Sequence, residues 1–512
     1  MDPHLGSGAA VEVHPRRWWA LGVLSLVLVV VGLDLTVLNV AVPLVATDLN
    51  ASIGELQWVI NAYTVVLATL LLPAGQLGDR FGRKKLLLGG LVFFGAASLV
   101  CAYATSPELL IAGRALLGVG AAFLNTLGLA VLVTIFPPEE RARAIGIQSV
   151  ALSAGIPLGP IVGGLLVENF WWGSVFLINV PLVVIALVGL SVLVPESTTS
   201  RPPRIDVLGF VLAVTGLCAL SYGLIDAGET SWVNPIALVA MGIGLIALAG
   251  FVLWQRRVAE PLADLTLFAD RNYTLGSVLS AFVQFSVFGI MFILPQFFQA
   301  VLGASELQTG LWLLPLVVAM IVGVQIGAPL RPRIGSRGVI MGGFIALAVG
   351  LVLGAMNGPD AGFAYAVGWT ALIGFGFGMS MPPAIDIALE AIPTEKSGGG
   401  SALLQAQRQV GAVLGVAVMG SVLATNYRGS LDTSQLPPEA AVSASYSGAS
   451  GVAVAEQLGL PQFADAVRTS FTAGMAAALW TCAAVTVVCV LMAAPVRPSL
   501  ADRSKGGAHA DT

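Results

Sequence analysis

Long apolar runs alternate with short polar connections along almost the whole chain. A helix needs about 20 apolar residues to cross the hydrocarbon core of a bilayer. Fourteen runs of roughly that length are expected to be membrane-spanning helices: 19–45, 57–77, 86–104, 109–135, 143–167, 174–194, 207–226, 233–254, 274–301, 309–330, 339–356, 362–386, 399–425 and 469–494. The first run follows "HPRRWW", which resembles the start of a signal peptide. Because it is longer than the apolar part of a signal and leads directly into further spans, we expect it to be retained.

The composition narrows the class of protein. Of the 512 residues 57% are hydrophobic and only 10% are charged, whereas a soluble domain carries about 25% charged residues. All three histidines lie in the terminal tails, and the four cysteines lie inside apolar runs without a Cys-x-x-Cys pair. We therefore expect a multi-pass membrane protein with no metal site, no cofactor and no nucleic-acid partner. An enzyme and an ATP-driven pump are both disfavoured, since the chain has neither a metal-spaced His/Cys set nor a GxxxxGK[ST] motif.

The basic residues predict the orientation, because cytoplasmic loops carry the excess of lysine and arginine. Of the 24 such residues, 20 fall on one predicted side, among them "DRFGRKK" at 79–85 and "RAR" at 141–143. Only Arg428 and Arg468 fall on the other side, and Arg114 and Arg408 lie within spans. Both termini are thus expected in the cytoplasm, which agrees with an even number of spans. One long external segment, 426–468, is expected to contain short amphipathic pieces.

A weak internal repeat links two of the short connections. The segment after the second predicted helix reads "GQLGDRFGRKKLLL" (75–88), and the segment after the tenth reads "APLRPRIGSRGVIM" (328–341). When the two are aligned, Leu77, Arg80 and Gly82 match Leu330, Arg333 and Gly335. Two related halves of this kind are typical of transporter folds built from parallel repeats.

Several motifs, in order along nearly the whole chain, give a more specific indication. "GQLGDRFGRKK" resembles the loop signature of the major facilitator superfamily. "LDLTVLNVAVP" (33–43), "QWVINAY" (57–63), "LLIAGRALLGVGAAF" (109–123), "SAGIPLGPIVGG" (153–164) and "LQAQRQVGAVLGVA" (404–417) resemble motifs of its fourteen-span drug:proton antiporter branch.

The resemblance implies an all-α major facilitator fold with 14 transmembrane helices. Its expected parts are a cytoplasmic tail (1–17), an N-terminal six-helix bundle (18–195), two linker helices (196–270), a C-terminal six-helix bundle (271–495) that includes the external loop, and a second cytoplasmic tail (496–512).

The glycines of "SAGIPLGPIVGG" form a regular stripe. Gly155, Gly159 and Gly163 recur every four residues, so they share one helix face and let another helix approach closely. Pro160 removes a backbone donor and favours a bend. The resemblance implies that this stripe is a sliding seam between the two halves, set against the helix at 399–425 with its own small residues Gly411, Gly415 and Met419, and that the chain is an exporter. Ordinary tight packing is the alternative.

Asp34 is the acidic residue expected deep in the membrane. It lies 15 residues past Trp19, or about 22 Å along a helix. A carboxylate at such a depth is a functional hypothesis by default, and here it would carry the proton that drives transport. Arg114 on the fourth helix is the natural partner, because the resemblance places both helices in one bundle. The alternatives are a helix-packing aspartate and a purely structural arginine.

Aromatic and amide side chains dominate the expected substrate site. The candidates are Trp58, Asn61, Tyr63, Gln284, Phe288, Phe292 and Gln299. Such a lining suits bulky amphiphiles held mainly by apolar burial, although each residue could equally serve packing. Exporters of organic cations in this branch often carry a carboxylate where Asn61 stands. We therefore expect neutral or weakly cationic compounds.

A third set of residues is expected to act in conformational change or gating. Asp79, Arg80 and Arg83 lie in the loop signature, which the resemblance implies to be a latch of one conformation. Asp386 and Glu390, four residues apart, share a helix face near the cytoplasmic rim. Arg408 belongs to the late-helix motif.

Together these features predict a proton-coupled antiporter that exports bulky amphiphilic drugs, dyes or antibiotics by alternating access. The expected location is the bacterial cytoplasmic membrane, and the expected partners are a small-molecule substrate, protons and the lipid bilayer, with the chain as a monomer. A facilitator-superfamily importer, or an exporter of lipids or metabolites, is the alternative.

Overall fold

The computed structural model describes residues 16–196, 206–258, 261–358, 362–393 and 396–497. Most of both expected tails lies outside these residues, as do Arg201, Arg204, Arg503 and Lys505, which contribute to the predicted orientation. Every regular element of the described part is helical. The first group of helices consists of α1 (Arg17–Asp48), α2 (Ile53–Phe81), α3 (Arg83–Ala102), α4 (Pro107–Ile135), α5 (Pro138–Asn169), α6 (Ser174–Leu177) and α7 (Asn179–Leu193).

Two helices follow, α8 (Val207–Glu229) and α9 (Pro235–Gln255), and then a short 3-10 helix η1 (Leu265–Ala269). The second group consists of α10 (Arg271–Ala300), α11 (Glu306–Trp312), α12 (Leu314–Ala355), α13 (Phe363–Glu390), α14 (Ser397–Ser430), α15 (Pro438–Tyr446), α16 (Gly448–Leu458) and α17 (Pro461–Ala493). We call α1–α7 the N-terminal group and α10–α17 the C-terminal group.

Twelve stretches of the described chain are long and apolar enough to cross a membrane. Two features account for the difference from the fourteen expected spans. The stretch Glu306–Ala355 counts once although it covers two expected spans, and α5 contributes only the shorter apolar part Leu158–Asn169. The fold is thus a helical membrane fold, and fourteen crossings stay a prediction.

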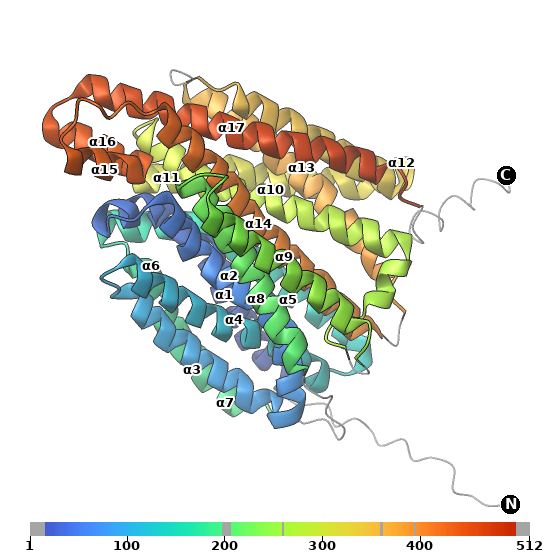
Figure 1. Ribbon diagram of the computed structural model, residues 1–512. Helices are drawn as coiled ribbons and strands as arrows, with labels where there is room; N and C mark the ends of the chain where they lie inside the picture. Colours follow the sequence, from blue (N-terminus) through green and yellow to red (C-terminus); the bar gives the residue numbers. More distant parts are fainter. Residues whose placement is uncertain (1–15, 197–205, 259–260, 359–361, 394–395, 498–512) are drawn as a thin grey trace, which may run out of the picture.

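Helices of each group pack mainly on one another (Figure 1). In the N-terminal group α1 packs on α5 and α7, and α4 packs on α2 and α3; in the C-terminal group α12 packs on α13 and α17, and α10 packs on α14. The start of α1 and the end of α17 lie at one end of the molecule, which we call the terminal end. The opposite end, with α15 and α16, is called the loop end. The two groups lie close together at the loop end and spread toward the terminal end (Figure 1).

The internal repeat is visible in the backbone. Gly82 joins α2 to α3 with a φ of 105°, and Gly335 interrupts α12 with a φ of 73°. A side chain is strained at such positive φ values, so glycine is favoured at both turns. The two glycines that align in the sequence therefore make the same kind of turn in the two groups.

The first linker helix, α8, packs on α14 of the C-terminal group near the loop end. Ser421 Oγ of α14 donates to the Leu224 carbonyl over 2.7 Å, and an atom added to Gly228 would lie 2.5 Å from the Ser421 Cα. The Glu229 carboxylate accepts from the Arg428 guanidinium of α14 over 3.2 Å and from the Gly54 amide of α2 over 3.1 Å. Glu229 thus joins both groups.

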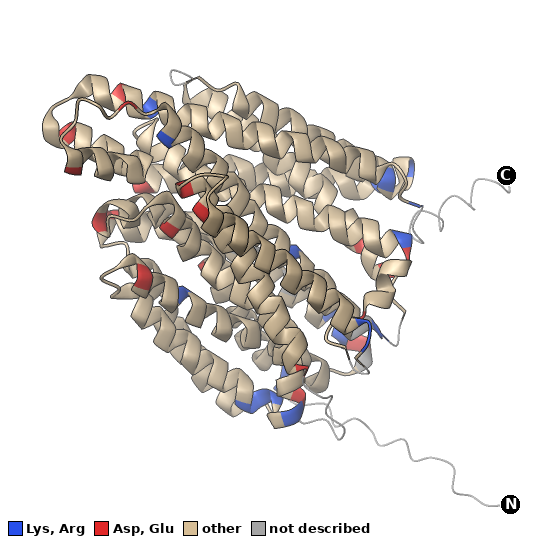
Figure 2. Cartoon of the chain, in the orientation of Figure 1, with Lys and Arg blue, Asp and Glu red and all other residues tan. Residues whose placement is uncertain are grey.

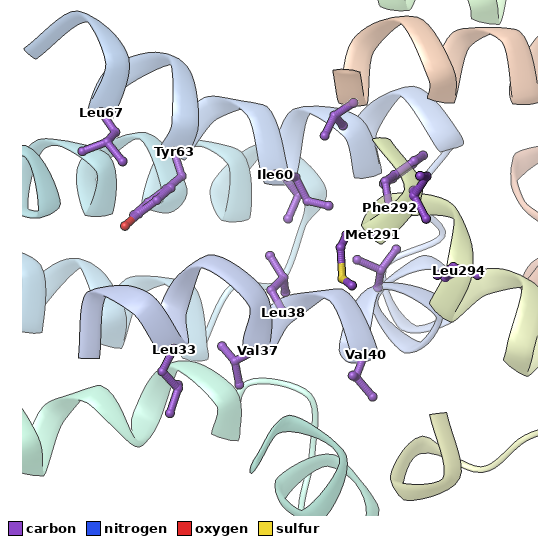
Figure 3. Close-up of a cluster of buried hydrophobic side chains, with 14 of the residues drawn as sticks. Leu33, Val37, Leu38, Val40, Ile60, Tyr63, Leu67, Met291, Phe292 and Leu294 are labelled. Atoms are coloured by element: carbon purple, nitrogen blue, oxygen red, sulfur yellow. The ribbon is translucent and has the colours of Figure 1, made fainter. Parts of the chain in front are cut away.

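Charge and apolar surface are sharply separated. Figure 2 shows lysine and arginine concentrated at the terminal end, while the middle of the helices carries few charged residues. In the interior α1 lies between α2 and α10, where Leu38 of α1, Ile60 of α2 and Met291 of α10 belong to one buried cluster (Figure 3). Among the described residues, the charged side chains of Asp34 and Arg114 sit within this apolar interior of the N-terminal group.

Candidate functional site

Asp34 and Arg114 form a buried ion pair inside the N-terminal group. The Arg114 Nη1 atom lies 2.8 Å from Asp34 Oδ2, and the two side chains are 2% and 0% exposed. Arg114 Nε also donates to the Val59 carbonyl of α2 over 3.1 Å. The predicted pairing of the two residues is present, and a part in proton coupling stays a prediction. A buried pair of this kind gives little net stability, because desolvation offsets the attraction between the charges.

Two further polar side chains complete the cluster, and the sequence reasoning missed both. Asn179 Nδ2 donates to Asp34 Oδ1 over 3.1 Å and lies 3.3 Å from the Ser98 hydroxyl oxygen. Asn179 and Ser98 are each 0% exposed. A single amide or hydroxyl in an apolar run carries no motif, so their only signal was their rarity in the runs "VFLINVPL" and "AASLVC".

The position of Asn179 follows from a local break in the chain. Pro181 has no N–H to donate to the Leu177 carbonyl, so one backbone hydrogen bond is missing there. The helical hydrogen-bond pattern is interrupted at Ile178, between α6 and α7, although the Ile178 backbone stays helical, with φ of −59° and ψ of −27°. Asn179 is the first residue of α7, and its side chain reaches Asp34.

Aromatic rings enclose the guanidinium. The Arg114 Cζ atom lies 4.4 Å from the centre of the Tyr63 ring and 5.8 Å from that of Phe176. Such cation–π contacts favour a desolvated guanidinium. Tyr63 was expected to line the substrate site, but it instead turns toward α4 and belongs to the Asp34 cluster. On α2, Tyr63 shares its face with Val59, whose carbonyl accepts a hydrogen bond from Arg114. A part of Tyr63 in substrate binding stays a prediction.

The other expected lining residues divide between packing and contact across the two groups. Gln299 Nε2 of α10 donates to the Val40 carbonyl of α1 over 3.0 Å, so it bridges the groups at the loop end. Phe292 is buried in the apolar core, as Figure 3 shows. Gln284 is also buried, whereas Trp58 and Phe288 are half-buried.

Asn61 differs from these residues, because it is fully buried and neither of its amide atoms has a partner among the described residues. One turn earlier on α2, Gln57 Nε2 donates to the Val416 and Ala417 carbonyls of α14 over 2.8 and 2.9 Å. Residues four apart share a helix face, so Asn61 lies on the face of α2 directed toward α14. A buried amide without a protein partner is a place where a ligand or water can bind.

The glycine stripe of α5 packs within its own group, which corrects the predicted partner. Atoms added to Gly155 and Gly163 would lie 2.5 Å from the Val29 carbonyl and 2.7 Å from the Val37 carbonyl of α1. Gly159 faces α1 too, against Thr36 and Val37. A small-residue stripe specifies close approach, but it does not specify the partner helix.

The small residues of α14 also have a different partner from the expected one. Atoms added to Gly411 and Gly415 would meet the Ala281 and Phe285 carbonyls of α10, and Met419 contacts Gly289 of α10. The other face of α5 does bridge the groups. The Pro160 carbonyl abuts Gly310 of α11, and an atom added to Gly164 would lie 2.8 Å from the Glu306 carbonyl.

The charged residues expected in gating lie at the terminal end, apart from Arg408. Asp79 pairs with Arg83 over 2.7 Å across the α2–α3 turn, and the exposed Arg80 lies beside Phe81. In the C-terminal group, Arg331 pairs with Asp386 over 2.6 Å and with Glu390 over 3.5 Å. The half-buried Arg408 donates to Gln405 over 2.8 Å, and its Nε has no partner among the described residues.

Two carboxylates at the terminal end have roles that the sequence did not indicate. Glu196 accepts from the Lys84 and Lys85 amides over 3.0 and 3.1 Å, which satisfies the first turn of α3. Asp264 pairs with Lys396 over 2.7 Å. Burial alone would raise the pKa of Asp264, but hydrogen bonds from Lys396 and Thr266 lower it below its ordinary value.

Comparison with known proteins agrees with this arrangement. The family model of the Major Facilitator Superfamily matches residues 24–416. The multidrug efflux pump LfrA of Mycolicibacterium smegmatis is 34% identical over 498 residues, which cover 96% of this chain and 97% of that protein. The puromycin resistance protein pur8 of Streptomyces alboniger is 35% identical over 81% of this chain and 84% of that protein.

A solved structure supports the fold. A bacterial homolog of the human lysosomal transporter Spinster superposes with a TM-score of 0.64 at 18% identity, covering 95% of this chain and 99% of that one. The family match spans both helix groups and the region between them. The chain therefore belongs to the major facilitator superfamily of membrane transporters.

Proposed function

We propose that this protein is a proton-coupled antiporter that exports bulky amphiphilic drugs, dyes or antibiotics across the bacterial cytoplasmic membrane. The observation that carries the proposal is the buried pair of Asp34 and Arg114 within a chain related over its length to a multidrug efflux pump. Burial of an ionisable carboxylate in a membrane protein costs free energy, so such a residue is a functional hypothesis by default. We assign to Asp34 the function of binding and releasing the coupling proton.

Coupling follows if the proton and the substrate favour different conformations. Loss of the proton from Asp34 creates the charge that Arg114 pairs with, and protonation removes it. Because α1 carries Asp34 and packs on α5, α10 and α4, a change at Asp34 acts on the helix that touches the C-terminal group. When the proton and the substrate favour different conformations, binding of one promotes release of the other. The two are then transported in opposite directions across the membrane.

We assign the terminal end to the cytoplasm, on the excess of basic residues there. Contacts that join the two groups lie at the loop end, where Gln57 and Gln299 reach backbone carbonyls of the opposite group. The described conformation is then closed to the outside. With α5 and both parts of the α11–α12 stretch counted as crossings, the chain spans the membrane fourteen times, with α8 and α9 as the linker helices between two six-helix bundles.

The substrate class is proposed from the relatives and from the lining. Two relatives are named for puromycin resistance and for tetracenomycin C resistance and export. A third is named for resistance to methyl viologen, a dication, and so differs from the substrate class proposed here. Asn61 supplies a free amide on the face of α2 directed toward α14. An amide orients a polar substrate without favouring a cation, so neutral or weakly cationic compounds fit best. The protein is expected to work as a monomer without a cofactor.

Transport of a fluorescent dye into everted membrane vesicles tests this function. An imposed pH gradient without ATP is expected to drive uptake of the dye, and collapse of the gradient and the membrane potential is expected to stop it. Uptake that survives the collapse but stops when ATP is removed would contradict proton coupling. Uptake in neither condition, with binding of a lipid or metabolite instead, would favour the alternative substrate classes.

A further inference from the structure

Asn179 bonds Asp34 but has no role in the proton coupling proposed above. Its amide nitrogen donates to Asp34 Oδ1 and lies next to the Ser98 hydroxyl, while its Oδ1 atom is buried and has no partner among the described residues. The orientation of the amide follows from Asp34, because an ionised carboxylate can only accept hydrogen bonds. The nitrogen must therefore face Asp34, and the carbonyl oxygen is left over.

The groups around Asp34 differ in whether they can accept a hydrogen bond from Asp34 once it is protonated. Arg114 from α4 is the charged neighbour, and a guanidinium can only donate. Tyr63 from α2 stacks on that guanidinium, and Cys101 from α3 is the other titratable group nearby. The facing stretches of α5, α6, α7 and α10 carry no ionisable side chain. Of the two side chains that bond Asp34 in the described part of the chain, only Asn179 has an acceptor.

We propose that Asn179 is a positioning residue that holds Asp34 in both protonation states by reversing its amide. This inference rests on the proposed function, in which Asp34 binds the coupling proton. With Asp34 ionised, Asn179 Nδ2 donates to the carboxylate, as described. With Asp34 protonated, the new O–H becomes a donor, and a half-turn of the amide sets the unpartnered Oδ1 where the nitrogen was.

Ser98 fits the same reversal. A hydroxyl is both donor and acceptor, so Ser98 accepts from Nδ2 in the described state and donates to Oδ1 after the half-turn. The proton stays on Asp34 throughout, and no proton passes through Asn179 or Ser98. The three side chains come from α1, α3 and α7, so their hydrogen bonds keep these helices together in either state.

Infrared spectra of the purified full-length protein, recorded across a pH titration, test this arrangement. The protonated Asp34 carboxyl gives a carbonyl band, identified as the band that is lost in Asp34→Asn. In Asn179→Leu, which has a similar size but neither donor nor acceptor, we expect this band to change position. The pH midpoint of the band is expected to move by less than about one pH unit, because both protonation states lose a hydrogen bond and the two losses partly cancel.

A second variant keeps the test decisive if Asn179→Leu does not fold. Ser98→Ala keeps the amide and removes one of its partners, and we expect a smaller displacement of the same band. Asn426→Leu, a matched change at an exposed site of α14, is expected to leave the band where it is.

Two results would overturn the inference, and they differ. If Asn179 serves the ionised state alone, the band in Asn179→Leu and in Ser98→Ala keeps the wild-type position. The midpoint in Asn179→Leu then rises by about one to two pH units, the effect of a lost hydrogen bond to a charged group. This outcome leaves proton binding at Asp34 intact. If no band depends on Asp34, both the inference and the proposed proton site fail.

Discussion

At the scale of single residues, the central feature is a carboxylate that two polar side chains bond in an apolar surrounding. Asp34 bonds Arg114 on one oxygen and Asn179 on the other, and Arg114 is further held by the Val59 carbonyl. The pair is therefore fixed from four helices, α1, α2, α4 and α7. Removal of one charge leaves the other buried and uncompensated.

Replacement of Arg114 by alanine is expected to lower the free energy of unfolding, by about 3–5 kcal/mol if the rule for buried pairs in soluble proteins applies. The reason is the unpaired Asp34 charge, so adding Asp34→Asn to Arg114→Ala is expected to recover part of the loss. Thermal unfolding of the detergent-solubilised variants measures both effects. Equal melting of Arg114→Ala and wild type, or a further loss in the double variant, would show that the charges are not coupled.

At the scale of helices, α5 packs on other helices with two of its faces. Its glycine stripe packs against α1, and the neighbouring face, at Pro160 and Gly164, packs against α11 of the C-terminal group. α5 thus touches both the helix with Asp34 and the other half of the molecule. Helix α8 is a second bridge, because Glu229 reaches Gly54 of α2 and Arg428 of α14.

Replacement of Gly159 by leucine is expected to abolish transport, because the added side chain would meet Thr36 and Val37 of α1. Overpacking of this kind costs about 1–3 kcal/mol. Gly146→Leu is the matched control on the same helix, since no described residue lies within 4 Å of an atom added to Gly146. Dye transport by the two variants, at equal amounts in the membrane, measures the difference. Normal transport by Gly159→Leu would show that this contact does not matter for the cycle.

Replacement of Glu229 by alanine is expected to favour opening at the loop end. Arg428 and the Gly54 amide then lose an acceptor, and a hydrogen bond to a charged group is worth about 1.5–3 kcal/mol. Spin labels at the exposed residues Asn50 and Gln462, one in each group, report the change as a longer distance. Thr433→Ala, outside the bridge, serves as control. An unchanged distance distribution in Glu229→Ala would mean that α8 does not hold this end closed.

At the scale of the whole molecule, the sequence predicted the features that follow from hydropathy and from charged residues that are rare in membrane spans. Apolar runs marked the helices, and Asp34 and Arg114, which are rare charged residues in those runs, marked the pair. The alignment of Gly82 with Gly335 predicted two related halves, and the structure adds that the two glycines make matching turns. The partner of the glycine stripe could not be predicted, since a GxxxG pattern encodes closeness and not identity.

Other parts of the site had no local signal. Asn179 acts through contact with α1 and α3, which are distant in sequence. Glu229 and Glu196 bond backbone amides of other helices, and such contacts depend on the packed fold. The contact of Tyr63 with Arg114 had no local signal for the same reason, because a tyrosine suits both a substrate site and a guanidinium.

Proton release on substrate binding tests the central claim most directly. A transported dye is added to the detergent-solubilised protein in weakly buffered solution near neutral pH, and the pH change is recorded for wild type and Asp34→Asn. The amide keeps the shape of the side chain but cannot titrate. We expect wild type to release protons and Asp34→Asn to release far fewer while it still binds dye. Equal proton release by the two proteins would place the coupling site elsewhere and contradict the account.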